Sequence, residues 1–156
     1  MPEDSLTSLD AIRMERCLEL AREAAARDEV PVGAIVVFEG EIVGAGRNRV
    51  EERASPLAHA EMEALGEAFR TLGAKRLPGA ELYCTLEPCF MCAGAILHAR
   101  IQRVVFGARD PKFGAVRSLA TVLEDDRSNH RCTVCEGVGA ERSAGLLRDF
   151  FRARRS

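Results

Sequence analysis

The residues with the clearest chemical potential are one histidine and two cysteines in separate parts of the chain. His59 stands two residues before Glu61, and thirty residues after His59 the pair Cys89 and Cys92 begins, directly behind Pro88. A structural zinc ion is normally closed by four protein ligands, whereas a catalytic zinc ion keeps one position open for water. Three ligands with a carboxylate nearby therefore predict a zinc-dependent hydrolase.

The spacing within each half of this motif separates ligands from catalytic groups. Cys89 and Cys92 are three residues apart, so on a helix their sulfurs share a face, and in a first helical turn the helix dipole favours thiolates. Glu61 points to a different side of its helix from His59. It is therefore expected beside the water, where it can accept a proton and pass it on as a general acid and base.

A chance Cys-x-x-Cys pair with an unrelated core histidine is the alternative interpretation. The proline, the glutamate and the spacing together favour one bound zinc ion per chain. The pair Cys132 and Cys135 is interpreted differently, because positions three apart on a strand face opposite sides of a sheet. These two, together with Cys17 and Cys84, are expected to be reduced structural thiols.

Composition and length indicate one soluble globular domain over residues 1–156, with residues 1–8 as a loose tail. Hydrophobic residues make up 47% of the chain and charged residues 29%, which is ordinary for a globular protein with a real core. The net charge of −2 gives no overall basic field that would indicate nucleic acid. We find no apolar stretch of eighteen residues and no secretion signal, so a cytoplasmic protein without a membrane partner is expected.

Hydrophobic spacing and turn residues predict the elements that must position the motif. Helices are expected at 8–27, 57–72, 88–98 and 145–155, with a short helix around 118–123. Strands are expected at 32–38, 41–48, 81–86, 103–108 and 131–136. Helices that alternate with strands after an initial hairpin are typical of a three-layer α/β/α sandwich around a mixed five-stranded sheet. Both halves of the motif fall at helix starts, where ligand sites of such sheets are usually found.

Three further features have both a functional and a structural interpretation. Asn48 ends a predicted strand and offers the donor and acceptor that reading a base edge requires, but it is also a common turn residue. Residues 110–114 combine opposite charges with an aromatic ring, and they also suit a solvated turn. Phe150 and Phe151, flanked by arginines, suit base stacking and phosphate contact. The alternative is a docking helix that buries Leu147 and Phe151.

From Val30 onward, about four-fifths of the chain resembles the bacterial tRNA-specific adenosine deaminases of the cytidine deaminase-like fold. The motif His-x-Glu followed by Pro-Cys-x-x-Cys is the signature of zinc nucleobase deaminases. The matching segments are 30–34, Asn48, 59–61, 85–89, 91–95, 105–110, 129–130 and 149–152. Small departures from the family pattern occur at Phe113, Val116, Arg117 and 127–128.

This resemblance implies that a homodimer converts adenosine to inosine at the wobble position of a tRNA anticodon. It implies one zinc ion per subunit, held by His59, Cys89 and Cys92, with Glu61 as the proton shuttle. Asn48 and the Ala60 backbone would hold the base. The positions expected near the anticodon loop are Asp110, Lys112, Asn129, Phe150, Phe151 and Arg152. Loop bases are already unpaired, which lowers the cost of bringing one to a buried site.

Two other functions remain open from the sequence. A deaminase of a free base or nucleoside, such as guanine or cytidine, would share the zinc site but would not need the arginine-rich C-terminal segment. A non-catalytic zinc-containing RNA-binding subunit would use the metal only for folding. The presence of Glu61 argues against the second alternative, because a purely structural site needs no proton shuttle.

Overall fold

The computed structural model describes residues 7–155. Most of the expected N-terminal tail, residues 1–6, lies outside the described residues. The first helix, α1 (Ser8–Ala26), begins behind a capping box: the Thr7 hydroxyl accepts the Asp10 N–H at 3.3 Å and the Asp10 carboxylate accepts the Thr7 N–H at 2.9 Å. Such reciprocal bonds satisfy backbone donors that the helix itself leaves free. Thr7 and Ser8 therefore belong to the helix start and not to a tail.

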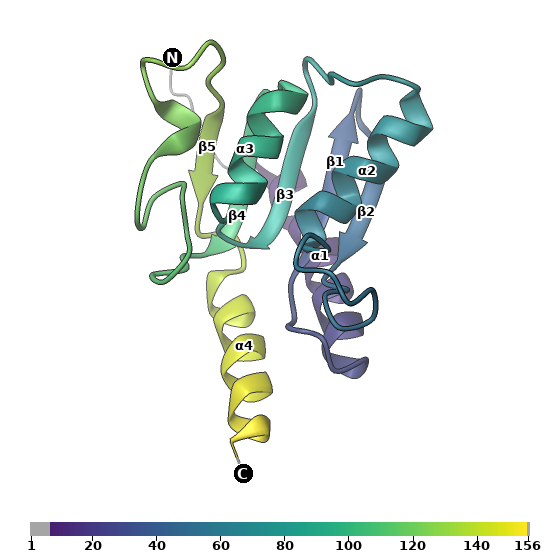
Figure 1. Ribbon diagram of the computed structural model, residues 1–156, viewed down its shortest axis with the longest axis vertical. Helices are drawn as coiled ribbons and strands as arrows, with labels where there is room; N and C mark the ends of the chain where they lie inside the picture. The colour runs from purple at the N-terminus through teal and green to yellow at the C-terminus, as the bar shows by residue number, and fades with distance from the viewer. Residues whose placement is uncertain (1–6, 156) are drawn as a thin grey trace.

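Five strands form one mixed sheet in the order β2-β1-β3-β4-β5 (Figure 1). The strands are β1 (Gly33–Phe38), β2 (Glu41–Arg47), β3 (Glu81–Leu86), β4 (Arg103–Ala108) and β5 (Thr133–Glu136). β1 pairs antiparallel with both β2 and β3, whereas β3, β4 and β5 are parallel. The carboxyl ends of β3 and β4 consequently meet at one edge of the sheet, and the connections that leave this edge can meet there.

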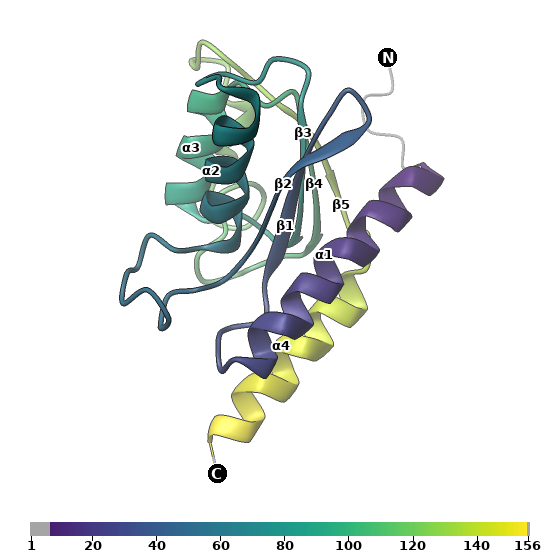
Figure 2. The same ribbon diagram turned by 90° about the vertical axis from the view of Figure 1, so that its right-hand side faces the viewer.

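Helices cover both faces of the sheet, which confirms the predicted three-layer sandwich (Figure 2). α2 (Ala60–Leu72) and α3 (Phe90–Ala99) lie on one face, and α1 and α4 (Ala140–Arg154) lie on the other. The core is divided in the same way. Side chains such as Leu65, Ile96 and Phe106 pack under α2 and α3, while Met14 and Tyr83 belong to the cluster under α1.

Helix α2 lies directly on β2 because neither surface carries a bulky side chain at the contact. A Cβ on Gly46 would lie 2.5 Å from the Ala60 carbonyl oxygen and 2.7 Å from the Ala64 nitrogen. Ala60 and Ala64 are completely buried one helical turn apart. This close approach fixes the start of α2, which carries the histidine and glutamate of the motif.

Several element boundaries differ from the predictions for local reasons. α2 begins at Ala60 and not near Leu57, because tight turns occupy the residues before it: the Ala58 N–H donates to the Ser55 carbonyl oxygen and the His59 N–H to that of Leu57. α3 begins only after Pro88, which therefore precedes the helix and does not occupy its first turn.

The C-terminal half shows two larger differences. The short helix expected at 118–123 is a 3₁₀ turn, η1 (Val122–Glu124), because the backbone N–H groups of residues 116–118 donate to a side chain and not to a helical carbonyl. α4 begins five residues earlier than predicted, directly after Gly139, whose φ of 69° allows the abrupt entry into the helix.

The second cysteine pair lies as the strand spacing predicts. Cys132 packs in the core under α2 and α3, where its thiol donates to the Ile101 carbonyl oxygen at 3.1 Å, and Cys135 packs on the opposite face. All six cysteines lie in the described part of the chain, and none of them forms a disulfide. Within residues 7–155, no helix is both long enough and apolar enough to cross a bilayer.

Candidate metal centre and substrate pocket

The three predicted metal ligands converge where α2 and α3 begin. His59 Nδ1 lies 3.6 Å from Cys89 Sγ and 3.5 Å from Cys92 Sγ, and all three ligand atoms lie within 4.8 Å of one another. Around a tetrahedral zinc ion, with bonds of about 2.0–2.1 Å to nitrogen and about 2.3 Å to sulfur, the nitrogen would lie about 3.5 to 3.6 Å from each sulfur. The donor types and their separations therefore fit zinc.

Two of the ligands occupy helix N-cap positions, His59 for α2 and Cys89 for α3. Neither side chain caps its own helix. Asn48, just after β2, supplies one missing acceptor: its Oδ1 accepts the Ala60 N–H at 3.0 Å. The positive ends of both helix dipoles consequently face the candidate metal centre, where they favour thiolates.

The two thiols and the imidazole perturb one another strongly. Hydrogen bonding from Cys92, together with that from His59, lowers the pKa of Cys89 to about 4. The same interaction with Cys89 raises the pKa of Cys92, and the hydrogen bond to Cys89 raises the pKa of His59. Such a cluster holds one thiolate by itself, and binding a divalent cation is the way to stabilise the second.

Glu61 lies beside the ligands but faces the pocket. Its side chain is buried, with 4% of the residue exposed, and burial raises the pKa of its carboxyl group. The buried Cys84 thiol lies against it and donates to the Leu86 carbonyl oxygen at 2.9 Å. Sequence reasoning treated Cys84 as an ordinary strand residue, and only the pairing of strand and helix shows that it contacts Glu61. A carboxyl group in such surroundings suits proton transfer.

A cavity of about 250 Å³ opens directly over these groups. It is lined by Val30, Val32, Asn48, His59, Glu61, Leu86, Glu87, Cys89, Asp110 and Phe113. The Asn48 Oδ1 is committed to the Ala60 N–H, which leaves the amide NH₂ group to face a ligand. The resemblance places the Ala60 backbone at the base, but the Ala60 N–H is already engaged, so the Asn48 amide group is the better candidate donor for base recognition.

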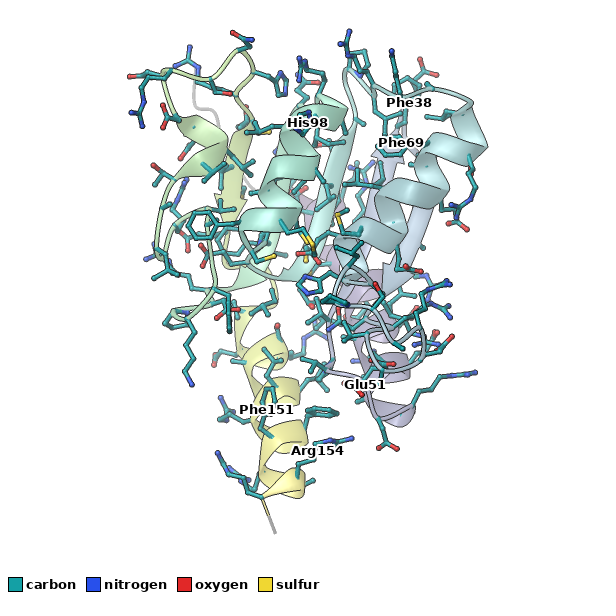
Figure 3. The ribbon with its side chains drawn as sticks, in the orientation of Figure 1. Phe38, Glu51, Phe69, His98, Phe151 and Arg154 are labelled. Atoms are coloured by element: carbon teal, nitrogen blue, oxygen red, sulfur yellow. The ribbon has the colours of Figure 1, made fainter. Side chains whose placement is uncertain are left out.

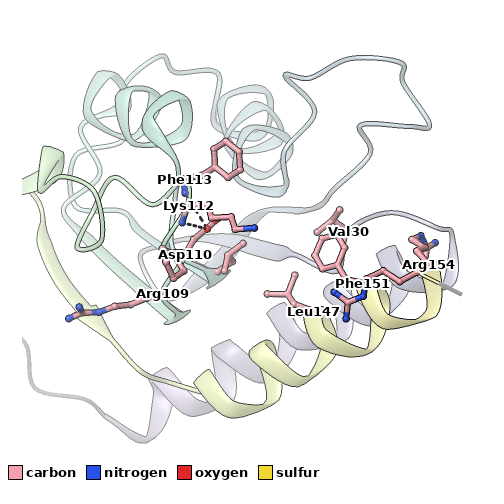
Figure 4. Close-up of a pocket in the computed structure, with 11 residues that line it drawn as sticks. Val30, Arg109, Asp110, Lys112, Phe113, Leu147, Phe151 and Arg154 are labelled. Carbon is pink, nitrogen blue, oxygen red and sulfur yellow. Dashed lines mark hydrogen bonds between the residues drawn. The ribbon is translucent and has the colours of Figure 1, made fainter.

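A larger hollow of about 690 Å³ adjoins this cavity and runs toward α4 (Figure 4). It shares Val30, Leu86, Asp110 and Phe113 with the inner cavity. The Asp110 carboxylate accepts the backbone N–H groups of Lys112 at 3.1 Å and Phe113 at 3.2 Å, so it folds its own loop (dashed in Figure 4). Lys112 and Phe113 project from this loop at the rim of the hollow.

The two adjacent phenylalanines of α4 have different surroundings. Phe150 is 8% exposed, and the Arg154 guanidinium lies 3.5 Å from the centre of its ring. Phe151 is 45% exposed and lines the outer hollow. The docking alternative placed Phe151 on the buried face, but Phe150 is the buried ring. Phe151 therefore presents the more exposed ring for stacking, while Phe150 lines a separate hollow together with Asn48 and His59.

The arginines at the C-terminal end of α4, and Arg155 directly after it, have different surroundings. Arg154 donates to Asp28 at 2.8 Å in addition to covering Phe150, so it fastens the end of α4 to the turn after α1. It extends from α4 toward the loop that carries Glu51, with which it lines a second hollow (Figure 3). Arg155 lines the outer hollow, whereas Arg152 does not and lies near Asp149, 4.0 Å away.

Asn129 is a predicted site residue that lies far from the pocket of its own chain. It is exposed in the loop before β5. Its neighbour His130 has Nε2 2.7 Å from the Ile101 carbonyl oxygen, beyond the C-terminal end of α3. The ligand Cys89 lies at the opposite end of the same helix, so within one chain Asn129 cannot contact a base at the candidate metal centre.

Two buried carboxylates that sequence reasoning did not single out organise the pocket walls. Glu29 accepts the backbone N–H groups of Glu51 at 3.1 Å and Glu52 at 2.7 Å. Glu87 accepts several backbone donors from the loop that follows β4. Burial alone would raise the pKa of Glu87, but hydrogen bonds, that of Ser118 foremost, lower it to about 2. The available signal was an acidic residue at the end of an apolar segment, which must find donors if it is buried.

Comparison with known proteins agrees with this site. Residues 9–155 match the MafB19-like deaminase family. The chain is 45% identical over 143 residues to the tRNA-specific adenosine deaminase of Bacillus subtilis (strain 168), an alignment that covers 92% of this chain and 89% of that protein. A solved structure from studies of A-to-I editing by tRNA deaminases at the wobble position superposes with a TM-score of 0.84 and 45% identity, covering 87% of this chain and 99% of that one. The guanine deaminase of Nitrosomonas europaea gives a TM-score of 0.79 and 29% identity, covering 96% and 87%.

Proposed function

This chain belongs to the MafB19-like deaminase family and, within it, to the tRNA-specific adenosine deaminases, and from that premise we propose that it hydrolyses adenosine to inosine at the wobble position of a tRNA anticodon. The observation that carries the proposal is the grouping of His59, Cys89 and Cys92 around one point, with Glu61 beside them in a pocket large enough for a base. The relatives that act on tRNA are also more similar to this chain than the guanine deaminase is.

The metal in this proposal is one zinc ion per chain, held by His59, Cys89 and Cys92. Two thiolates and an imidazole are a donor set that zinc prefers. A bound zinc ion supplies Lewis acidity, which makes water nucleophilic at neutral pH. Three protein ligands leave one coordination position for this purpose, as expected of a catalytic site and not of a structural one.

Glu61 carries the proton transfers of the reaction. Net hydrolysis joins the water oxygen to C6 of adenine and breaks the bond from C6 to the exocyclic nitrogen, which leaves as ammonia. Glu61 accepts a proton from the attacking water, donates it to the ring nitrogen N1, and then transfers the second water proton to the departing nitrogen. Burial, which raises the pKa of its carboxyl group, suits a group that must both accept and donate a proton.

The outer hollow supports a loop substrate in preference to a free base. A free base needs only the inner cavity, whereas neighbouring nucleotides need a surface that continues from it. That surface carries two exposed rings, Phe113 and Phe151, and cationic side chains that include Lys112 and Arg155. Exposed aromatic rings stack with unpaired bases, and cationic side chains contact phosphates.

We also propose a homodimer that forms through the outer face of α3. Phe90 is 54% exposed at the start of this helix, and Met91, Gly94, Ala95 and Leu97 remain partly exposed along it. A face with one large ring and small residues allows close packing of a second copy. Sedimentation equilibrium at micromolar concentration should give the dimer mass for the wild type and the monomer mass for Phe90→Glu; a wild-type monomer would contradict the proposal.

The function is tested by offering the purified protein an anticodon stem-loop with a wobble adenosine, free guanine and cytidine in parallel. Conversion of the stem-loop, measured as inosine by mass spectrometry of the digested RNA, is the expected result. Conversion of guanine or cytidine with no reaction on the stem-loop would overturn the assignment and favour a deaminase of small molecules.

A further inference from the structure

Glu87 holds a whole loop by its side chain. Its Oε1 accepts the backbone N–H of Asp110 at 2.9 Å and the hydroxyl of Ser118 at 2.5 Å. Its Oε2 accepts the backbone N–H groups of Val116, Arg117 and Ser118 at 3.0, 2.6 and 2.8 Å. The carboxylate is thus bonded at both ends of residues 110–118, which we call the 110–118 loop.

The same loop is packed against a metal ligand. Gly114 forms a β-bridge with Cys89, and the Ala115 N–H donates to the Pro88 carbonyl oxygen at 2.9 Å. A Cβ on Gly114 would overlap the Glu87 carboxylate, so only glycine allows this approach. The carboxylate, the loop and the backbone around Cys89 therefore form one packed unit.

The bonds to Glu87 need a full negative charge. Glu87 is 2% exposed and is surrounded by backbone N–H groups, and an amide in its place would turn an NH₂ group toward some of these donors. Hydrogen bonds to an ionised acceptor are about twice as strong as neutral ones. The Glu87 side chain faces inward, yet it consequently fixes the positions of the outward-facing loop residues Lys112 and Phe113.

We propose that Glu87 is a positioning residue for the RNA substrate: its carboxylate holds the 110–118 loop as a rigid wall of the pocket, so that Lys112 and Phe113 meet the nucleotides that flank the target base. The inference rests on the proposed function for the identity of the substrate. The rigidity of the loop can be measured without any substrate.

The test compares Glu87→Gln with Glu124→Gln. The control removes the same charge from a carboxylate that contacts the Arg117 side chain and no backbone donor of this loop. In Glu87→Gln, hydrogen exchange over residues 110–118 should accelerate by about tenfold or more, the factor expected for one lost bond to a charged group. KM for the stem-loop should rise by a similar factor, with kcat and zinc content changed much less, while the control resembles the wild type.

A second variant keeps the inference testable if Glu87→Gln does not fold. Ser118→Ala removes one of the five bonds and should show the same split between KM and kcat in weaker form. If both variants fold, their effects on exchange should be non-additive in the double variant, because they break one shared network. Unchanged exchange in the loop, or faster exchange with an unchanged KM, would overturn the proposal. A wild-type protein inactive on the stem-loop would instead refute the proposed function, and the exchange data would still decide whether Glu87 holds the loop.

Discussion

At the scale of single residues, the proposed chemistry depends on different roles for neighbouring residues at the start of α2. His59 is the cap residue before the helix and points to the candidate metal centre, while Glu61, two residues later, faces the cavity. Asn48 supplies the acceptor that the Ala60 N–H would otherwise lack. The proposed metal ligand, proton shuttle and base-reading group are thus positioned by one helix start.

Replacing Glu61 by glutamine should remove catalysis and preserve the site. The amide side chain has nearly the same volume but cannot accept and return a proton, so we expect kcat to fall by about 10²-fold to 10⁴-fold or more. Zinc content, measured by elemental analysis, should stay near one per chain. Glu63→Gln, on the same helix and paired with Arg53 on the surface, is the matched control. Substantial turnover by the metal-replete Glu61→Gln protein would refute the assigned role.

The candidate site was largely predictable where chemistry restricts residue types, and less so where a residue acts through the backbone. The ligand set and Glu61 follow from their types and spacing, and geometry brings them together. Glu87 was missed because a buried carboxylate bonded to backbone amides has no sequence signature beyond its apolar neighbours. The separation of Asn129 from Cys89 within one chain was not predictable, because it depends on the length of α3, which a motif does not express.

At the scale of elements, close contacts between very small residues decide where the candidate metal ligands lie. α2 lies directly on β2, because glycines of the strand face alanines of the helix. Helix and strand types were predictable from periodicity, whereas helix starts were not: the ligands themselves occupy cap positions that serine or aspartate usually fills. A capping rule therefore misjudges those boundaries wherever a functional residue takes the cap.

Gly46→Ala should displace α2 and weaken metal binding. The new Cβ would lie 2.5 Å from the Ala60 carbonyl oxygen, so the helix start must shift away from the sheet. We expect a loss of about 1 to 3 kcal/mol in the free energy of unfolding, typical of overpacked cores, and a lower zinc affinity in competition with a chelator. Gly66→Ala, within α2, has only a flexible arginine tip near its new Cβ. It should leave the zinc affinity unchanged. Wild-type zinc affinity in Gly46→Ala would contradict this view of α2.

The attachment of α1 to the sheet should weaken in acid. Asp10 is 1% exposed; burial by itself would raise the pKa of its carboxyl group, but hydrogen bonds from Arg103, Tyr83 and Thr7 lower it from 3.8 to about 2. A pKa lower in the folded state stabilises the protein above the unfolded value, and this stability is lost as the pH falls from about 4 toward 2. The full contribution is about 2 kcal/mol.

Urea unfolding at several pH values between about 5 and 2 checks this prediction. Asp10→Asn has no titrating carboxyl group at this position, so the difference in free energy of unfolding between wild type and variant should shrink as the pH falls. A difference that stays constant over this range would show that Asp10 is not the titrating group.

At the scale of the whole molecule, the substrate surface joins segments that are distant in sequence. The starts of α2 and α3 and the 110–118 loop contribute to the inner cavity, and the outer hollow adds α4. The sandwich was predictable from the alternation of helices and strands. The face of α4 that meets the hollow was not predictable. α4 begins earlier than its sequence suggests, and Phe150, not Phe151, is buried.

The cationic side chains at the outer hollow should govern the salt dependence of RNA binding. Each phosphate contact that is lost on single-stranded RNA should reduce the log–log slope of affinity against salt by about 0.7. Arg155→Ala is expected to show this change and a weaker affinity for the stem-loop. Arg152→Ala makes the same charge change three residues earlier, in α4 and away from the hollow, and serves as the control. Arg154 is unsuited to this comparison, because its loss would also free the end of α4. A wild-type slope in Arg155→Ala would remove the Arg155 side chain from the RNA-binding surface.

The most direct test of the central claim maps the reaction within one RNA. An anticodon stem-loop that carries one adenosine at the wobble position and a second adenosine elsewhere in the loop is incubated with the zinc-loaded protein, and inosine is located by sequencing, where it is read as guanosine. We predict inosine at the wobble position alone, in the wild type and not in Glu61→Gln. Absence of inosine from the RNA, while the same preparation deaminates free guanine or cytidine, would contradict the account.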